Sequence, residues 1–118
     1  MNKEAIKTFS YRISQASKTE LVVIMYDMAQ EYLKDAIQAL NDDDKIGFCN
    51  NIRQVKRVID ELSSGLDMQY EISGNLYVLY NYMKRTLIGA QVSYDKSVVN
   101  SIYDMLGQLR QSFYEVSR

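Results

Sequence analysis

Apolar residues recur every three or four positions along most of the chain, which is the spacing that places them on one face of an α-helix. Between residues 19 and 40 the apolar side chains occupy one half of a helical cylinder, and polar side chains fill the other half. Just before this run, Ser17 and Glu20 fit a capping box, in which the two residues satisfy free backbone N–H groups reciprocally. The pattern predicts a long amphipathic helix over residues 19–40.

Three further apolar stripes at helical spacing follow the first helix and predict three more helices. The second comes after an acidic turn, should end near Gly65, and carries Phe48, Ile52, Val55, Val58, Ile59 and Leu62. The third begins near residues 71–75 and carries Leu76, Leu79, Tyr80, Met83 and Leu87. The fourth follows the capping residues Ser93 and Asp95 and carries Val98, Ile102, Met105, Leu106, Leu109 and Phe113.

These elements predict an all-α fold. The chain has no Pro and only five dispersed Gly, so little in it interrupts a helix. Four helices of about 17 to 22 residues with short connections pack most simply as an antiparallel up-and-down four-helix bundle. We expect residues 17–118 to form this single domain, and residues 1–16 to form a short cap helix or an extended arm lying on it.

The residue types that most catalytic and metal centres need are scarce in this chain. It has no His, which excludes imidazole-based triads and His-containing metal sites. Its one cysteine, Cys49, can form no internal disulfide, and we expect it to pack as a small apolar residue. The acidic run at residues 42–44 lacks the pattern of an EF-hand loop and indicates a solvated capping turn. We therefore predict no enzyme activity, catalytic residue, cofactor or metal site.

The charge and hydropathy of the chain exclude two classes of partner. Lys and Arg number 14 against 15 Asp and Glu, and this scattered balance does not favour nucleic-acid binding. The longest apolar run, residues 21–26, is far shorter than the roughly 20 residues of a membrane-spanning helix, so no membrane insertion is expected. The first 12 residues contain no apolar segment typical of a secretory signal, which predicts a cytoplasmic location.

Some apolar residues lie outside the predicted stripes. They are Val23, Ile24, Tyr77, Val78, Ile88, Val99, Tyr103 and Tyr114. Each alone is explained as marginal core or as cover for a loop. Together they suggest grooves between helices, and Tyr and Met suit such surfaces because Tyr combines apolar area with a polar tip and Met adapts its shape.

Several motifs occur in an order that covers nearly the whole chain. They are Tyr11, Ile13, Ala16-Ser17, Leu21, Ile24-Met25-Tyr26-Asp27, Glu61-Leu62-Ser63-Ser64-Gly65-Leu66-Asp67, Asn75-Leu76-Tyr77-Val78-Leu79-Tyr80-Asn81-Tyr82-Met83, Leu87, Ala90 and Leu106-Gly107-Gln108-Leu109-Arg110. In this ordered set the chain resembles the FliS family of flagellar secretion chaperones.

The resemblance implies a cytoplasmic export chaperone. Such a protein binds the disordered C-terminal segment of flagellin, prevents its premature polymerisation and supports flagellar type III secretion by delivering it to the export apparatus. The segment around Tyr11 and Ile13 is then expected to lie over part of the client site as a displaceable cap. The residues predicted to face the client or the cap are Tyr11, Ile13, Leu21, Ile24, Tyr77, Val78, Ile88 and Tyr103.

Four further residues match family motifs but have a structural interpretation that is equally open: Tyr26, Asp27, Leu66 and Asp67. In that interpretation Tyr26 packs in the core, and Asp27 caps a helix or pairs locally.

An alternative function is a structural or adaptor bundle that uses the same apolar strips to self-associate or to bind another helical protein. A monomer or weak homodimer is expected. A third hypothesis, an enzyme that relies on carboxylates and Tyr, has no supporting motif.

Overall fold

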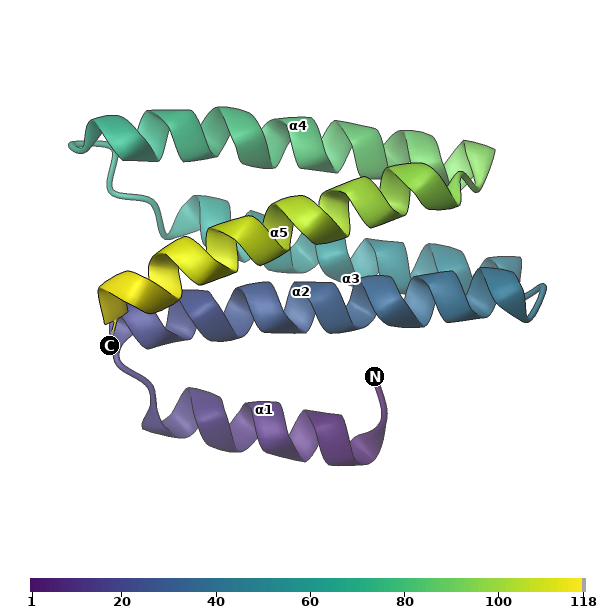
Figure 1. The fold of residues 1–118 in the computed structure, drawn as a ribbon, viewed down its shortest axis with the longest axis horizontal. Coiled ribbons are helices and arrows are strands. Elements are labelled where there is room, and N and C mark those ends of the chain that lie inside the picture. Colours follow the sequence, from purple (N-terminus) through teal and green to yellow (C-terminus); the bar gives the residue numbers. More distant parts are fainter. Residues whose placement is uncertain (118) are drawn as a thin grey trace.

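Five α-helices and no strand make up residues 1–117, the part of the chain that the computed structural model describes (Figure 1). The helices are α1 (Lys3–Gln15), α2 (Lys18–Asn41), α3 (Lys45–Ser64), α4 (Glu71–Ser93) and α5 (Lys96–Ser117). The all-α prediction is confirmed, and residues 3–15 form a helix rather than an extended arm. Arg118, the last residue of the predicted domain, lies outside the described residues.

The starts of α2 and α3 are fixed by side chains that the sequence had marked as caps. The Ser17 hydroxyl accepts a hydrogen bond from the Glu20 backbone N–H at 3.2 Å and donates one to the Glu20 carboxylate at 2.9 Å. Ser17 thus caps α2 as predicted, while the Glu20 carboxylate pairs with the Ser17 hydroxyl and not with a backbone N–H as a reciprocal capping box requires. At the acidic turn, the Asp44 carboxylate accepts the Gly47 backbone N–H at 2.8 Å, which confirms a capping turn.

The turn between α4 and α5 places Tyr94 in the left-handed region, with φ of 56°. Its ring packs on Phe48 of α3 with the ring centroids 5.7 Å apart, which helps hold this conformation. Asp95 then caps α5 by accepting the Ser97 backbone N–H at 2.9 Å, and hydrogen bonds from Ser97 lower the pKa of this carboxyl. Ser93 is the last residue of α4 and not a cap of α5.

Helix α2 lies between the other helices of the molecule. It packs against α3 and α5. Helix α4 packs against the same two helices, and α2 and α4 share no backbone contact. Figure 1 shows α2, α3, α4 and α5 running in alternating directions, with α1 lying along the outside of α2. In the described residues α1 contacts only α2 at the level of the backbone.

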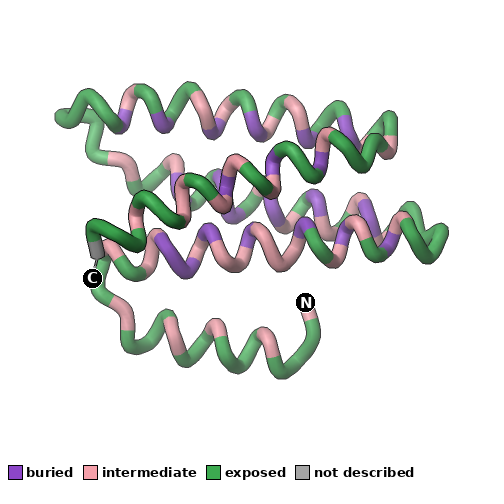
Figure 2. Tube along the Cα trace, viewed as in Figure 1, coloured by how far each residue is buried: buried purple, intermediate pink, exposed green. Residues whose placement is uncertain are grey.

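The core lies between α2, α3, α4 and α5, and Figure 2 shows buried positions on these helices and none on α1. At its centre the hydroxyls of Tyr26 and Tyr80 are 2.5 Å apart and hydrogen-bonded, and both side chains are almost fully buried. Burial raises the pKa of Tyr26 and of Tyr80, because a phenolate inside the core would lose its hydration. The pair is therefore neutral.

Most predicted stripe residues are in the core, but the buried surface is wider than the stripes. Val99 has no exposed surface and belongs to the core, although its spacing places it at the margin of its stripe. Val23 and Ile24 are also buried, and they lie outside the main core cluster. Tyr32 is half-buried against the core, and so is Cys49, whose thiol is 3.8 Å from the Gln91 carbonyl oxygen.

Tyr26→Phe should lower the free energy of unfolding by about 1–3 kcal/mol, because the Tyr80 hydroxyl would be left buried without a partner. The double variant with Tyr80→Phe should be less destabilised than the sum of the two single variants, since it removes both polar groups together. Urea denaturation measures all three, with Tyr82→Phe, whose side chain is exposed, as the control. Additive losses would contradict the coupling.

Stability should also fall as the pH rises above about 10, where tyrosines of the unfolded chain ionise. The folded state keeps the protons of Tyr26 and Tyr80 because their pKa values are raised, so the unfolded state binds fewer protons than the folded state in this range. The double Phe variant should lose this part of the alkaline destabilisation. Thermal unfolding monitored between pH 8 and pH 11 checks the difference.

Candidate functional site

Helix α1 rests on the outside of α2 without burying any of its residues. Its apolar residues Ile6, Tyr11 and Ile13 remain exposed. Polar contacts also join the segment to α2, and they include an ion pair between Asp35 and the amino group of Met1 at 2.8 Å; the Met1 side chain is only 3% exposed. A helix with no buried side chain lacks the main source of helical stability in proteins, so α1 is the least firmly packed of the five.

Asp27 of α2 forms ion pairs with two other helices. Its Oδ2 accepts a hydrogen bond from Nη2 of Arg12 on α1 at 2.8 Å, and its Oδ1 accepts one from Nε of Arg110 on α5 at 2.9 Å. The Asp27 side chain is 19% exposed, so both charge-assisted bonds are partly shielded from water and stronger than surface pairs. The two partners of Asp27 are 15 and 83 residues away in the sequence, so Asp27 does not pair locally.

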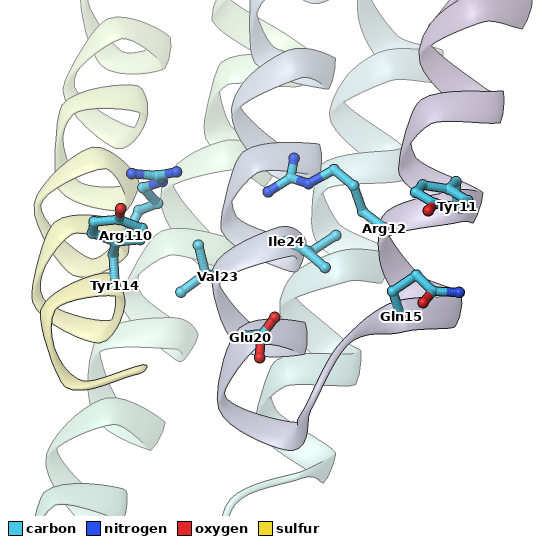
Figure 3. A pocket seen from close by; sticks show the side chains of 8 residues that line it. All are labelled: Tyr11, Arg12, Gln15, Glu20, Val23, Ile24, Arg110 and Tyr114. Carbon is cyan, nitrogen blue, oxygen red and sulfur yellow. The ribbon is translucent and has the colours of Figure 1, made fainter. Parts of the chain in front are cut away.

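A groove of about 500 Å³ lies beside these ion pairs, with α1 and α5 on its two sides and α2 at its base. Its lining consists of Tyr11, Arg12, Gln15, Glu20, Val23, Ile24, Arg110 and Tyr114. Figure 3 shows Arg12 and Arg110 extending from opposite sides above Val23 and Ile24, with Glu20 nearer the start of α2. Val23 and Ile24 therefore form an apolar floor that α1 and α5 flank.

A second groove, of about 280 Å³, lies between α1, α2 and α3. Its lining consists of Ile13 of α1, Leu21, Met25, Met28 and Tyr32 of α2, and Gln54, Arg57, Val58 and Glu61 of α3. Because Tyr11 lines the first groove and Ile13 the second, α1 separates two apolar grooves on the same helix.

A third groove, of about 570 Å³, opens near the connection between α3 and α4. Leu66 and Asp67 of this connection line it with Leu21 of α2, Leu76 of α4 and Phe113 of α5. Leu21 lines both the second and the third groove, so these two grooves adjoin at the start of α2.

The chain matches, over residues 1–118, the model of a protein family described as flagellar protein FliS. It belongs to the FliS family. A protein of Bacillus subtilis (strain 168) named flagellar secretion chaperone FliS is 24% identical over 101 residues, which cover 86% of this chain and 76% of that protein. A protein of Salmonella typhimurium with the same name is 27% identical over 108 residues, covering 89% of this chain and 80% of its relative.

FliS is a family of flagellar secretion chaperones and not of enzymes, and this confirms the resemblance. Within residues 1–117 no group of three or more Cys, Asp or Glu side chains could hold a metal ion. None of the five described helices is long and apolar enough to cross a membrane.

The predicted client-facing residues of this FliS-family chain fall into separate groups. Tyr11 and Ile24 line the first groove, and Ile13 and Leu21 line the second. Ile24 is only 4% exposed in this structure, in which α1 is in place. The remaining predicted residues, Tyr77, Val78, Ile88 and Tyr103, line none of the three grooves.

Those four residues lie on two helices. On α4, Tyr77, Val78 and Ile88 are exposed. On α5, Tyr103 is half-buried against the core, and its carbonyl oxygen accepts a hydrogen bond from Gln30 at 3.1 Å. The involvement of all eight residues in client binding stays a prediction.

Arg12 and Arg110 were not among the predicted site residues. Arg110 closes a family motif and Arg12 stands between two predicted cap residues, so both lay inside segments that the resemblance had marked. Nothing in helical spacing links either residue to Asp27, because the contact depends on how separate helices pack.

Ile88→Ala should change the free energy of unfolding by less than about 0.5 kcal/mol, because its side chain is exposed on α4. Met83→Ala on the same helix should lower it by about 2–5 kcal/mol, since Met83 is fully buried and its truncation leaves a cavity. Urea denaturation of both variants compares the two faces of α4. A larger loss for Ile88→Ala would mean that α4 packs through the opposite face.

Proposed function

We propose that this FliS-family chain is a cytoplasmic export chaperone that binds the disordered C-terminal segment of flagellin, prevents its premature polymerisation and supports flagellar type III secretion. The observation that carries the proposal is the family match along the whole chain, with two relatives named flagellar secretion chaperone. The grooves on both sides of α1 add a physical site for such a client. The proposed partners are flagellin and the flagellar export apparatus.

The proposed mechanism is masking by binding. The client segment folds into amphipathic helices whose apolar residues fill the grooves along α2, with spacings of three and four between anchors. Ordering a disordered segment costs about 2–5 kcal/mol or more of the interaction energy, which permits release in spite of a large contact area. The client is thereby protected without any covalent step.

In this proposal residues 1–16 are a displaceable cap over part of the client site. Because no residue of α1 is buried, displacement of the helix itself removes little apolar contact, and the Met1 amino group also gives up its ion pair with Asp35. Tyr11 and Ile13 would leave with the cap, and Ile24 and Leu21 would then face the client. The exposed residues of α4, together with Tyr103, would extend the contact along a second surface.

We further propose that α2 to α5, within residues 17–118, form a single domain with the architecture of an antiparallel up-and-down four-helix bundle. The closed series of pairings from α2 to α3, α4, α5 and back to α2 supports this architecture.

A second candidate function is self-association or binding of another helical protein, and the exposed apolar residues of α4 favour it: Ile72, Tyr77, Val78, Tyr82, Ile88 and Val92. A symmetric dimer would bury the same patch on both copies. A monomer or weak homodimer is the state compatible with client binding. Sedimentation velocity discriminates, because a stable dimer that persists after client is added would support the alternative.

Titration calorimetry with a C-terminal fragment of the flagellin of the same organism should show binding that orders the fragment. Leu21→Ala should weaken this binding by roughly tenfold, because Leu21 lines two adjoining grooves and its side chain contributes about 1.5–3 kcal/mol when buried. Ile46→Ala removes an exposed apolar side chain at the far end of α3 and serves as the matched control. Absence of binding by a folded protein would contradict the proposal.

A further inference from the structure

Arg12 is the one cation of α1 that forms an ion pair in the described residues. Lys3 and Lys7 of the same helix are exposed and form none there. Arg12 also stands between Tyr11 and Ile13, whose side chains line the grooves on the two sides of α1. The contact with Asp27 therefore ties α1 to α2 between the two grooves, and the ion pair between the Met1 amino group and Asp35 ties the start of the segment.

The two arginines that meet Asp27 are each oriented by an aromatic ring of their own helix. The Arg12 guanidinium lies over the Phe9 ring at 5.5 Å, and the Arg110 guanidinium lies over the Tyr114 ring at 5.0 Å. Such stacking restricts the side chain beforehand, so less conformational entropy is lost when it forms the ion pair. Asp27 is thus held between two cations whose guanidinium groups each lie over an aromatic ring.

Departure of α1 would leave the carboxylate incompletely paired. Oδ1 of Asp27 would keep Arg110, while Oδ2 would lose Arg12. Glu20, a second carboxylate, lines the adjacent groove together with Arg110, whereas Asp27 is outside that lining. A helix that covered this place without supplying a cation would bury Oδ2 without a partner, which is strongly unfavourable.

We propose that Asp27 selects the helix that occupies this part of α2: α1 holds the position through Arg12, and a client helix that displaces α1 presents Arg or Lys to the same carboxylate oxygen. This inference rests on the proposed function and adds the chemistry of the client. The client is an amphipathic helix with apolar residues on both sides of one basic residue. Asp27 then rejects apolar helices that lack the cation, which is discrimination by an unpaired charge.

The first experiment measures how readily α1 opens in the full chain. Arg12→Gln should speed backbone hydrogen exchange in residues 3–15 by roughly tenfold, because a partly buried charge-assisted bond is lost. Lys7→Gln is the matched control, since it removes the same charge from α1 without touching Asp27, and its exchange should equal that of the unaltered protein. Equal exchange in the two variants would overturn the role of Arg12.

The second experiment separates release of α1 from recognition of the client. Arg12→Gln should tighten binding of a flagellin C-terminal fragment by several-fold, because the competing helix is weakened while Asp27 stays intact. Asp27→Asn weakens α1 as well, but it also removes the charge that the client reads, so its affinity should be roughly tenfold below that of Arg12→Gln. Equal affinities for the two variants would overturn the selection by Asp27.

Client variants keep the test decisive if Asp27→Asn is poorly folded. Each Arg and Lys of the fragment is replaced in turn by Gln, and one of these replacements should weaken binding to the unaltered chaperone by roughly tenfold. The same replacement should weaken binding to the Asp27→Asn variant by less than twofold, where that variant folds. If no basic residue of the fragment matters, the inference is wrong although the proposed function stands. If no variant binds the fragment at all, the proposed function itself is wrong, and the inference with it.

Discussion

The hydrogen bond between the hydroxyls of Tyr26 and Tyr80 joins α2 to α4, two helices that share no backbone contact. It lies in the core, where both tyrosines are almost fully buried. A buried hydroxyl without a partner is strongly unfavourable, so the distance and rotation of α2 relative to α4 are restricted to arrangements that keep the pair together. The apolar layers contributed by α3 and α5 pack around this fixed connection.

Tyr26 also determines where its neighbour Asp27 lies. Successive residues of an α-helix are about 100° apart around the axis, so a side chain next to one that faces the core points sideways or outward. Asp27 accordingly emerges on the outer side of α2, within reach of both Arg12 and Arg110. The two adjacent residues therefore serve different layers of the structure: Tyr26 connects α2 to the interior, and Asp27 connects it to α1 and to the last turns of α5.

The sequence predicted the helices, three of their caps and most of the core, because spacing and capping are local properties of a chain. It underestimated the buried surface of α2. A single-stripe pattern assigns each helix one buried face, whereas α2 has neighbours on three sides, and α1 and α5 cover Val23 and Ile24. Surplus apolar residues predicted that grooves exist, but the positions of the grooves and the partners of Asp27 could not be predicted, since they depend on how helices distant in sequence are placed together.

The weak packing of α1 and its specific ion pair have complementary consequences for recognition. A helix tethered to its own binding site has a high effective concentration there, so a tightly packed α1 would exclude any client. No residue of α1 is buried, so α1 gains little contact energy from this high effective concentration, and in the proposed mechanism a client with larger apolar anchors replaces it. The Arg12 ion pair supplies what apolar contact does not, since it gives the closed state a defined register and leaves behind a charge that an unsuitable helix cannot satisfy.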